Sequence, residues 1–436
     1  MELSCSRIKK THIHKFGGSS LSCPDSFLRV AQIIKSHTGN GMSSMDGWVV
    51  VSAAGKTTNR LINVAEKAFQ EKEQALSLLM DIAHFQLNLF NVFYNIDELF
   101  EQELIRHQLS NELQQDIDQL KKQIFSCDRL VTCFDDWVCF GELWSARLMA
   151  QLLTCLGKPA KAVDSRSFIL CDGEHVDLEV SKKKLSHLGL VPISDDSSLK
   201  VVTGYIASDK QGRTVTLGRN GSDYSASLCA RLTGATKLFF WSDVSGIYSA
   251  DPNRVEEAYP LAEISWELAD TLAKTGSPVL HTRTLDVIGN VDCEVFLKNS
   301  HHPSAPGTKI VRKYKPSVCL VSAVNHISLL ASEELTKLKN AHVLLESRSP
   351  ENQYCFIKPE FRENYSNSKE VGLILISGIK KDIEVTLNKE RVSYFHIWEV
   401  NEETFLVFCY GSITNAQYSA MHARVCKHSE DIKSCA

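Results

Sequence analysis

Between residues 12 and 310, the spacing of apolar positions alternates between strand-like runs and helix-like periods. Short runs of β-branched and apolar residues predict strands at 13–16, 48–53, 159–163, 200–203, 214–217, 236–241 and 293–297. Between them, apolar residues recur every three or four positions and predict helices at 25–35, 58–69 and 142–153. Strands that alternate with helices favour an α/β fold with a largely parallel sheet sandwiched by helices.

A long charged segment, residues 72–125, interrupts this alternation. Its leucines and isoleucines keep a helical spacing, so we expect a helical excursion from the sheet. A packing element or a lid is a more plausible role for it than a catalytic unit.

The pattern of predicted elements changes after the turn-rich run at 301–307. Short strands are predicted at 318–322, 326–331, 371–376 and 404–409, with short helical pieces between them. Since 436 residues exceed the usual size of one compact domain, we predict a domain over 1–310 and a smaller α+β region over 311–436.

Two glycine loops follow predicted strands and precede predicted helices. In the first, Lys15 stands before Gly17, Gly18 and Ser19, and Pro24 suits the first turn of the next helix. Adjacent glycines let backbone N–H groups approach an anion, and a lysine adds a point charge on phosphate.

The second loop combines Gly218, Arg219 and the Asn220-Gly221 pair after an apolar run that looks like a buried strand. Ser222 and Asp223 suit the start of the following helix. Exposed amides, a helix N-terminus and a guanidinium there favour an anion. An ordinary capped loop is the alternative for either segment alone.

Charge and composition narrow the class of protein. The net charge is −4, so no broad basic surface points to nucleic acid. No uninterrupted apolar span of bilayer length and no signal pattern is visible, so we expect no membrane partner and a cytoplasmic location. The 14 cysteines show no Cys-x-x-Cys spacing, which favours small buried side chains over a metal site or disulfides.

Five stretches fall in the order typical of one family. They are residues 15–20, 49–59, 141–145, 217–223 and 241–252. As a set they resemble the glycine loops, the Gly-Glu helix start and the nucleotide-binding strand of the aspartate kinases, within the amino acid kinase family. The resemblance covers roughly residues 10–310.

The resemblance implies transfer of the γ-phosphoryl of ATP, with Mg2+, to the side-chain carboxylate of L-aspartate. The product is 4-phospho-L-aspartate, and the reaction is the first step of lysine/diaminopimelate, threonine and methionine biosynthesis. Because that carboxylate is ionised at neutral pH, no general base is needed, and catalysis must come from positioning and cationic stabilisation.

Motif positions imply the site residues. Lys15 and Asp223 are the implied catalytic pair, Arg219 would hold the α-carboxylate of aspartate, and Glu142 its ammonium group. Thr58 and Ser222 are the remaining implied substrate contacts. The implied ATP-binding residues are Lys15, Gly17, Gly18, Ser19, Ser242, Asp243, Tyr248 and Arg254.

Several positions carry an alternative interpretation. Glu142 could be only a first-turn helix charge, Asp223 only a cap, and Arg254 a solvated loop residue. Pro278 stands where the family usually has a lysine for the nucleotide phosphates. Another amino acid kinase, of the glutamate or carbamate class, and a non-catalytic amino-acid-sensing subunit are therefore alternatives to an aspartate kinase.

The family resemblance also bears on residues 311–436. Tandem ACT domains, which bind amino acids, usually stand there, and we expect that architecture in reduced form. Lysine would then be a candidate feedback inhibitor, and a homodimer paired through this ACT-like region the expected assembly.

Overall fold

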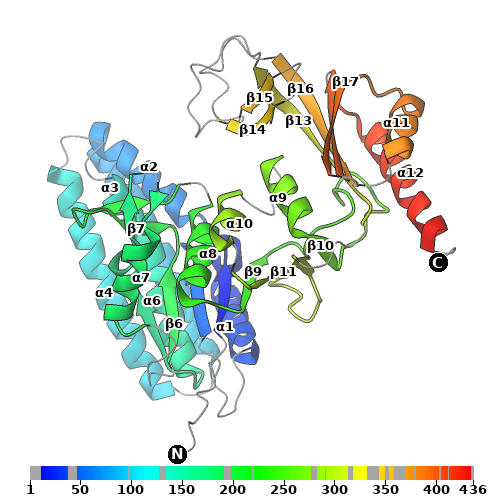
Figure 1. Cartoon of the computed structure of the whole chain (residues 1–436). Helices are drawn as coiled ribbons and strands as arrows, with labels where there is room; N and C mark the ends of the chain where they lie inside the picture. The colour runs from blue at the N-terminus through cyan, green and yellow to red at the C-terminus, as the bar shows by residue number, and fades with distance from the viewer. Residues whose placement is uncertain are drawn as a thin grey trace, which may run out of the picture. The chain divides into compact units, whose positions relative to one another are not determined.

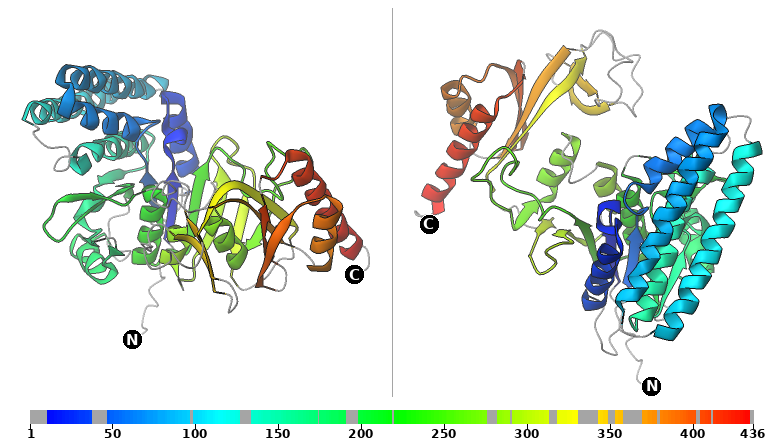
Figure 2. Two further views of the ribbon diagram at one scale, coloured as in Figure 1. Left: turned by 90° about the horizontal axis from the view of Figure 1, so that it is seen from above. Right: turned by 180° about the vertical axis from the view of Figure 1, so that it is seen from behind.

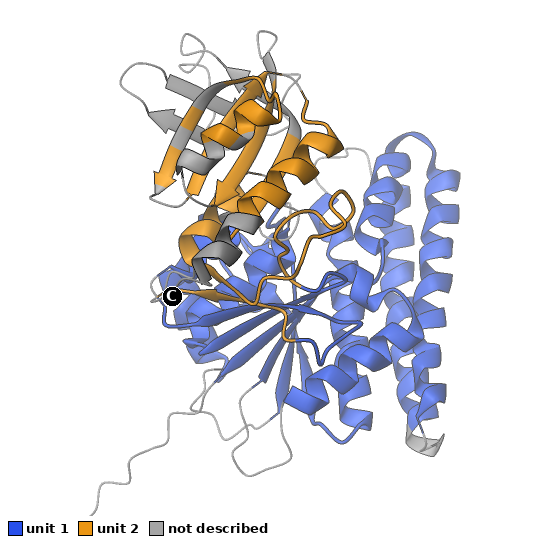
Figure 3. Ribbon diagram, turned by 90° about the vertical axis from the view of Figure 1, so that its right-hand side faces the viewer, with its two compact units in different colours: residues 1–245, 283–305 blue, residues 246–282, 306–436 orange. Residues whose placement is uncertain are grey.

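The structure is a computed structural model of the chain. It describes residues 11–37, 47–96, 99–126, 134–173, 175–190, 198–218, 220–275, 282–289, 291–312, 318–330, 343–348, 353–357, 369–377, 380–401, 404–410 and 412–433. Two compact units make up the chain, 1–245 with 283–305 and 246–282 with 306–436 (Figure 3). The predicted division into a catalytic domain over 1–310 and a smaller region over 311–436 stays a prediction.

The first unit is built on a parallel sheet (Figure 1). Its strands are β1 (His12–Phe16), β2 (Gly47–Val51), β3 (Ala160–Val163), β6 (Leu199–Thr203), β9 (Lys237–Ser242) and β11 (Glu294–Asn299). They lie in the order β11-β9-β1-β2-β6-β3. The predicted α/β class is confirmed, and six of the seven strands predicted between residues 13 and 297 belong to this sheet.

Helices cover both faces of this sheet. Val49 and Val51 of β2 pack into one apolar cluster with α1 (Pro24–His37) and α6 (Phe140–Cys155). All of β2 is buried, and successive strand residues point to opposite faces. The other face is covered by α8 (Gly221–Thr233), which contacts β1, β2 and β9. A strand covered on both sides must be apolar throughout, which explains the unbroken Trp48–Val51 run.

The excursion at 72–125 is helical. It consists of α3 (Lys72–Leu89), the 3-10 segment η2 (Phe90–Asn95) and α4 (Leu99–Ser126), and it follows α2 (Thr57–Gln70). Helices α3 and α4 run side by side in both views of Figure 2. Lys72–Asn95 is long and apolar enough to cross a membrane by length and composition alone, and 44% of its 18-residue apolar window is buried inside the protein.

The prediction of a buried strand at 214–217 was wrong in its setting. Strand β8 (Thr214–Thr216) pairs antiparallel with β7 (Ile206–Ser208) in a separate hairpin, and its residues are only half-buried. Leu217 is the one residue of the run that is buried. Alternation of Thr and Val satisfies a half-exposed hairpin as well as a sheet interior, so the residue types did not separate the two.

Shorter elements complete the first unit. They are η1 (Gly18–Leu21), α5 (Phe134–Val138), η4 (Ser165–Ser167), β4 (Cys171–Asp172), β5 (His175–Val176), α7 (Leu178–His187) and α10 (Thr282–Ile288). Helix α1 starts at Pro24 as predicted, and α6 places Gly141 and Glu142 in its first turn.

The second unit carries an antiparallel sheet in the order β14-β15-β13-β16-β18-β17. Its strands are β13 (Leu320–Leu330), β14 (Val343–Arg348), β15 (Gln353–Ile357), β16 (Lys369–Ser377), β17 (Tyr394–Asn401) and β18 (Thr404–Tyr410). Helices α11 (Lys380–Lys389) and α12 (Asn415–Lys433) belong to it, as do β10 (Glu263–Ser265), α9 (Trp266–Lys274) and β12 (Thr308–Val311). This strand-rich region is consistent with the predicted ACT-like architecture.

The two strands predicted at 318–322 and 326–331 form a single strand. Strand β13 runs from Leu320 to Leu330, and its register against β16 shifts between Val324 and Ile327. Such a bulge adds a residue without ending the strand, so the strand continues through residues 323–325, where the sequence predicted a break.

Candidate functional site

A cavity of about 430 Å3 opens in the first unit. It lies beyond the carboxyl ends of β1 and β2, where ligands bind in sheets of this kind. Its lining consists of Lys15, Gly17, Gly18, Ser52, Ala53, Gly55, Lys56, Thr58, Asn59, Ile62, Glu142, Tyr205, Gly218, Asn220, Gly221, Ser222 and Asp223. Both predicted glycine loops therefore face one cavity.

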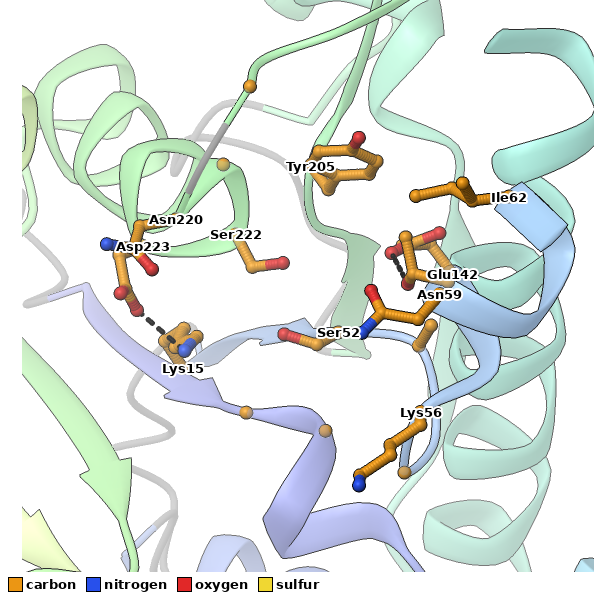
Figure 4. Close-up of a pocket in the computed structure, with 17 residues that line it drawn as sticks. Lys15, Ser52, Lys56, Asn59, Ile62, Glu142, Tyr205, Asn220, Ser222 and Asp223 are labelled. Carbon is orange, nitrogen blue, oxygen red and sulfur yellow. Dashed lines mark hydrogen bonds and ion pairs between the residues drawn. The ribbon is translucent and has the colours of Figure 1, made fainter. Parts of the chain in front are cut away.

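An ion pair marks one side of the cavity (Figure 4). The Lys15 Nζ atom lies 2.6 Å from Asp223 Oδ1, and the two side chains are 13% and 24% exposed. Lys15 comes from the end of β1 and Asp223 from the first turn of α8. The pair keeps the ammonium group at the mouth of the first glycine loop, where it can meet an anionic ligand.

A buried carboxyl group marks the opposite side. Glu142 is 1% exposed, and Thr58 Oγ1 donates a hydrogen bond of 3.2 Å to its Oε1 atom. Its Oε2 atom is buried with no hydrogen-bond partner among the described residues. Burial raises the pKa of Glu142 to about 8, against hydrogen bonds from backbone N–H groups and Thr58 that lower it. This side of the cavity can therefore accept a cationic group.

Glycines bring the loops of the cavity into close contact. A Cβ atom on Gly18 would stand 2.6 Å from the Gly55 carbonyl oxygen and 2.7 Å from that of Ala53. The Gly55 N–H group donates to the Gly18 carbonyl at 2.9 Å. The first glycine loop is thus fixed against the loop after β2, which leads into α2 and Thr58.

The second loop reaches the cavity through a left-handed backbone residue. Asn220 has φ 56° and precedes α8, and its side chain makes no capping hydrogen bond. Asp223 lies inside the first turn of this helix, and its carboxylate pairs with Lys15. The alternative that Asp223 is only a cap was wrong, since Asn220 is the N-cap residue and Asp223 pairs with Lys15.

Most of the predicted catalytic and substrate residues come together here. The cavity is lined by Lys15, Gly17, Gly18, Thr58, Glu142, Ser222 and Asp223. Arg219 and Pro278 lie outside the described residues. Ser19 is exposed and is absent from the lining. Ser242, the last residue of β9, and Asp243, the residue after it, belong to the same unit and are absent from the lining too.

Tyr248 and Arg254 belong to the second unit. There the Arg254 guanidinium donates to Asn415 Oδ1 at 2.8 Å and to the carbonyl oxygens of Ala323 and Ile413, both at 3.3 Å. It also lies 4.4 Å from the centre of the Tyr418 ring. The solvated-loop alternative for Arg254 does not describe this arrangement, and the nucleotide role of both residues stays a prediction.

Sequence reasoning gave no site role to several lining residues, among them Ser52, Lys56, Asn59 and Tyr205. Tyr205 has φ 69°, which is uncommon for an aromatic residue and recurs at functional sites. Burial raises the pKa of its hydroxyl group. Gly204-Tyr205 directly after the buried 199–203 run was the signal available, because residues that follow parallel strands reach the ligand edge of the sheet.

Comparison with known proteins identifies the family of this chain. Residues 10–299 match the model of the amino acid kinase family. Bifunctional aspartokinase/homoserine dehydrogenase 2 of Escherichia coli (strain K12) is 31% identical over 407 residues, which are 93% of this chain and 44% of that protein. The chain thus spans less than half the length of this relative.

Two solved structures share the fold. Escherichia coli aspartokinase III in complex with aspartate and ADP has a TM-score of 0.75 at 23% identity, covering 96% of this chain and 100% of that chain. The same enzyme in complex with lysine and aspartate has a TM-score of 0.73 at 23% identity, covering 95% and 99%.

Proposed function

This chain belongs to the amino acid kinase family, and on that premise we propose that it is an aspartate kinase. It transfers the γ-phosphoryl of ATP to the side-chain carboxylate of L-aspartate and gives 4-phospho-L-aspartate. One observation carries the proposal: a single cavity has the Lys15–Asp223 ion pair on one side and the buried Glu142 carboxyl on the other. The match to the bifunctional aspartokinase of Escherichia coli is in keeping with it.

The acceptor side of the cavity suits an α-amino acid. Glu142 Oε2 has no partner among the described residues, and an ammonium group would both pair with it and lower its pKa. Thr58 holds the other oxygen of the same carboxyl, so the orientation of the group is fixed before substrate arrives. Ser222 is a further polar contact, and Arg219 would take the α-carboxylate in a bidentate fork.

The chemical step brings two anions together. The acceptor carboxylate attacks the γ-phosphorus, the bond to the bridging oxygen of ATP breaks, and ADP leaves. No proton moves, so the protein must offset repulsion and stabilise charge on the transferring group. Lys15 supplies the positive charge, Gly17 and Gly18 supply backbone N–H groups, and Asp223 orients the ammonium group of Lys15.

The nucleotide and its metal ion complete the proposal. We assign Ser19, Ser242, Asp243, Tyr248 and Arg254 to the nucleotide from the family pattern alone. Mg2+ is commonly bound by one or two carboxylates together with substrate phosphates. Asp223 is the carboxylate that lines the cavity beside Lys15, and no group of three His, Cys, Asp or Glu side chains forms a metal site within the described ranges.

Three further parts of the proposal rest on the family. The reaction would be the first step of lysine/diaminopimelate, threonine and methionine biosynthesis, in the cytoplasm. Lysine is a candidate effector, in keeping with the lysine complex of the Escherichia coli aspartokinase III that shares this fold. A homodimer through the ACT-like region is the proposed assembly.

An ATP-dependent hydroxamate assay tests the proposal. An acyl phosphate reacts with hydroxylamine, so aspartate with ATP and Mg2+ should give aspartyl hydroxamate, while omission of ATP should abolish it. Hydroxamate from glutamate alone would favour another amino acid kinase. Aspartate binding without turnover would favour the sensing subunit that Pro278 suggests.

A further inference from the structure

The carboxyl end of β11 carries two buried polar residues that the proposed mechanism does not use. Asn299 is 5% exposed and Ser300 is fully buried. Neither lines the cavity. They stand where β11 lies beside β9, so they are next to the loop of Ser242 and Asp243.

Asn299 fixes the loop that follows β9. Its Nδ2 atom donates to the Asp243 carbonyl at 3.2 Å and to Ser245 Oγ at 3.0 Å. Its Oδ1 atom accepts from the His301 N–H group at 2.7 Å. A single amide side chain thus contacts the backbone of Asp243 and the side chain of Ser245.

Ser300 joins that loop to the first glycine loop. Its N–H group and its hydroxyl group both donate to the Ser242 carbonyl, at 2.8 and 3.1 Å. Its Oγ atom also lies 3.0 Å from the Oγ atom of Ser20, which is 1% exposed. Since a hydroxyl has one proton, Ser20 donates to Ser300, and Ser300 donates to Ser242.

We propose that Ser300, supported by Asn299, is a positioning residue that holds η1 and the 242–245 segment in one fixed relation. The other flank of the first glycine loop is already held by the Gly55–Gly18 backbone bond. The Ser20–Ser300 bond holds the flank nearest β9. Both loops are assigned to ATP, so the hydrogen-bond chain acts on nucleotide binding and leaves the aspartate side around Glu142 untouched. This inference rests on the proposed function.

Ser300→Ala tests the inference because it removes both hydroxyl bonds but keeps the backbone bond to Ser242. We expect the KM for ATP to rise about 5- to 10-fold, in line with the loss of one or two hydrogen bonds. The KM for aspartate should stay within about twofold. Ser20→Ala should act in the same direction, and the double variant should be no worse than Ser300→Ala, because both substitutions break one chain of bonds.

Ser181→Ala is the matched control. Ser181 is another fully buried serine of the first unit, and its Oγ atom accepts from the Leu170 N–H group at 3.0 Å, away from the cavity. It should lower the thermal stability as Ser300→Ala does, but leave both KM values unchanged. Equal changes in both KM values for Ser300→Ala, or none, would overturn the inference.

Calorimetric titration of ATP without aspartate separates this inference from the proposed function. If the wild-type protein binds ATP but does not phosphorylate aspartate, the proposed function fails, and weaker ATP binding by Ser300→Ala still supports the positioning role. If the wild-type protein does not bind ATP, both fail.

Discussion

Lys15 is the one cation that the described structure pairs with a carboxylate inside the cavity. Lys15→Ala and Asp223→Ala should each reduce kcat by at least about 10²- to 10³-fold, because charge on the transferring phosphoryl is left unstabilised. Steady-state kinetics measure this, and unchanged circular dichroism shows that the fold is kept. Lys56→Ala is the control, since Lys56 is an exposed lining lysine to which we give no role. Comparable losses for all three variants would contradict the assignment.

Arg219 carries the prediction for substrate choice. Arg219→Lys keeps the charge but loses the planar fork that matches a carboxylate. We expect the KM for aspartate to rise at least about 10-fold, while the KM for ATP stays nearly constant. An unchanged KM for aspartate would remove Arg219 from the acceptor site.

Glu142 makes aspartate binding depend on pH. Its pKa of about 8 means that the empty site holds a neutral carboxyl at pH 7. Because an ammonium group pairs with the charged form, the KM for aspartate should fall as pH rises from 6.5 towards 8.5. Glu142→Gln should raise this KM and remove its pH dependence. A pH-independent KM in the wild-type protein would contradict this role.

The raised pKa of Glu142 also makes the stability of the folded chain depend on pH. The folded chain keeps the proton up to about pH 8, whereas the ordinary pKa is 4.5. The contribution of Glu142 to the free energy of unfolding therefore decreases as pH rises from 4.5 to 8. Glu142→Gln should have a higher Tm than the wild-type protein at pH 8–9, and this difference should shrink towards pH 4.5. Differential scanning calorimetry measures both values.

At the scale of elements, the loops of the cavity depend on close backbone packing. A side chain at Gly18 would collide with backbone oxygens of the loop after β2, whereas a Cβ atom on Gly17 would make only ordinary contacts, with Lys15 Nζ at 3.5 Å and Ser19 Oγ at 4.0 Å. Gly18→Ala should therefore lower kcat/KM at least about 10-fold more than Gly17→Ala. Equal effects of the two substitutions would show that the loops tolerate displacement.

Helix α3 of the helical excursion is hydrogen-bonded to the segment that follows β2. Gln86 of α3 is buried and donates to Thr57 Oγ1 at 3.1 Å, and Thr57 Oγ1 donates to the Ala54 carbonyl at 2.7 Å. This chain of bonds reaches the loop that leads into α2, where Thr58 lies. Of the two roles expected for residues 72–125, the packing role is the one these contacts favour.

The elements themselves show what a sequence can and cannot predict. Continuous apolar runs such as Trp48–Val51 are explained only by burial on two faces, so the parallel sheet could be predicted. Lys15 was found because it stands beside a glycine loop, and Glu142 because residues 141–145 resemble the Gly-Glu helix start of the family. Tyr205 was missed although it closely follows the buried 199–203 run, because its residue type does not reveal its left-handed φ. Ser300 was missed because a hydrogen bond between residues 280 positions apart leaves no local pattern.

At the scale of the whole molecule, the ACT-like region raises the question of feedback. We expect lysine, titrated into the aspartate assay, to inhibit with a saturable curve, because amino-acid-binding modules of this kind act through a separate site. Threonine and methionine serve as controls. A flat response to lysine would exclude lysine as the effector, whatever the catalytic activity.

A crystal structure with ADP and aspartate tests the central claim most directly. We predict aspartate in the cavity of the first unit, with its ammonium group within 3.2 Å of Glu142 and its side-chain carboxylate turned towards Lys15. Aspartate bound elsewhere, with the space between Lys15 and Glu142 closed or empty, would contradict the proposal.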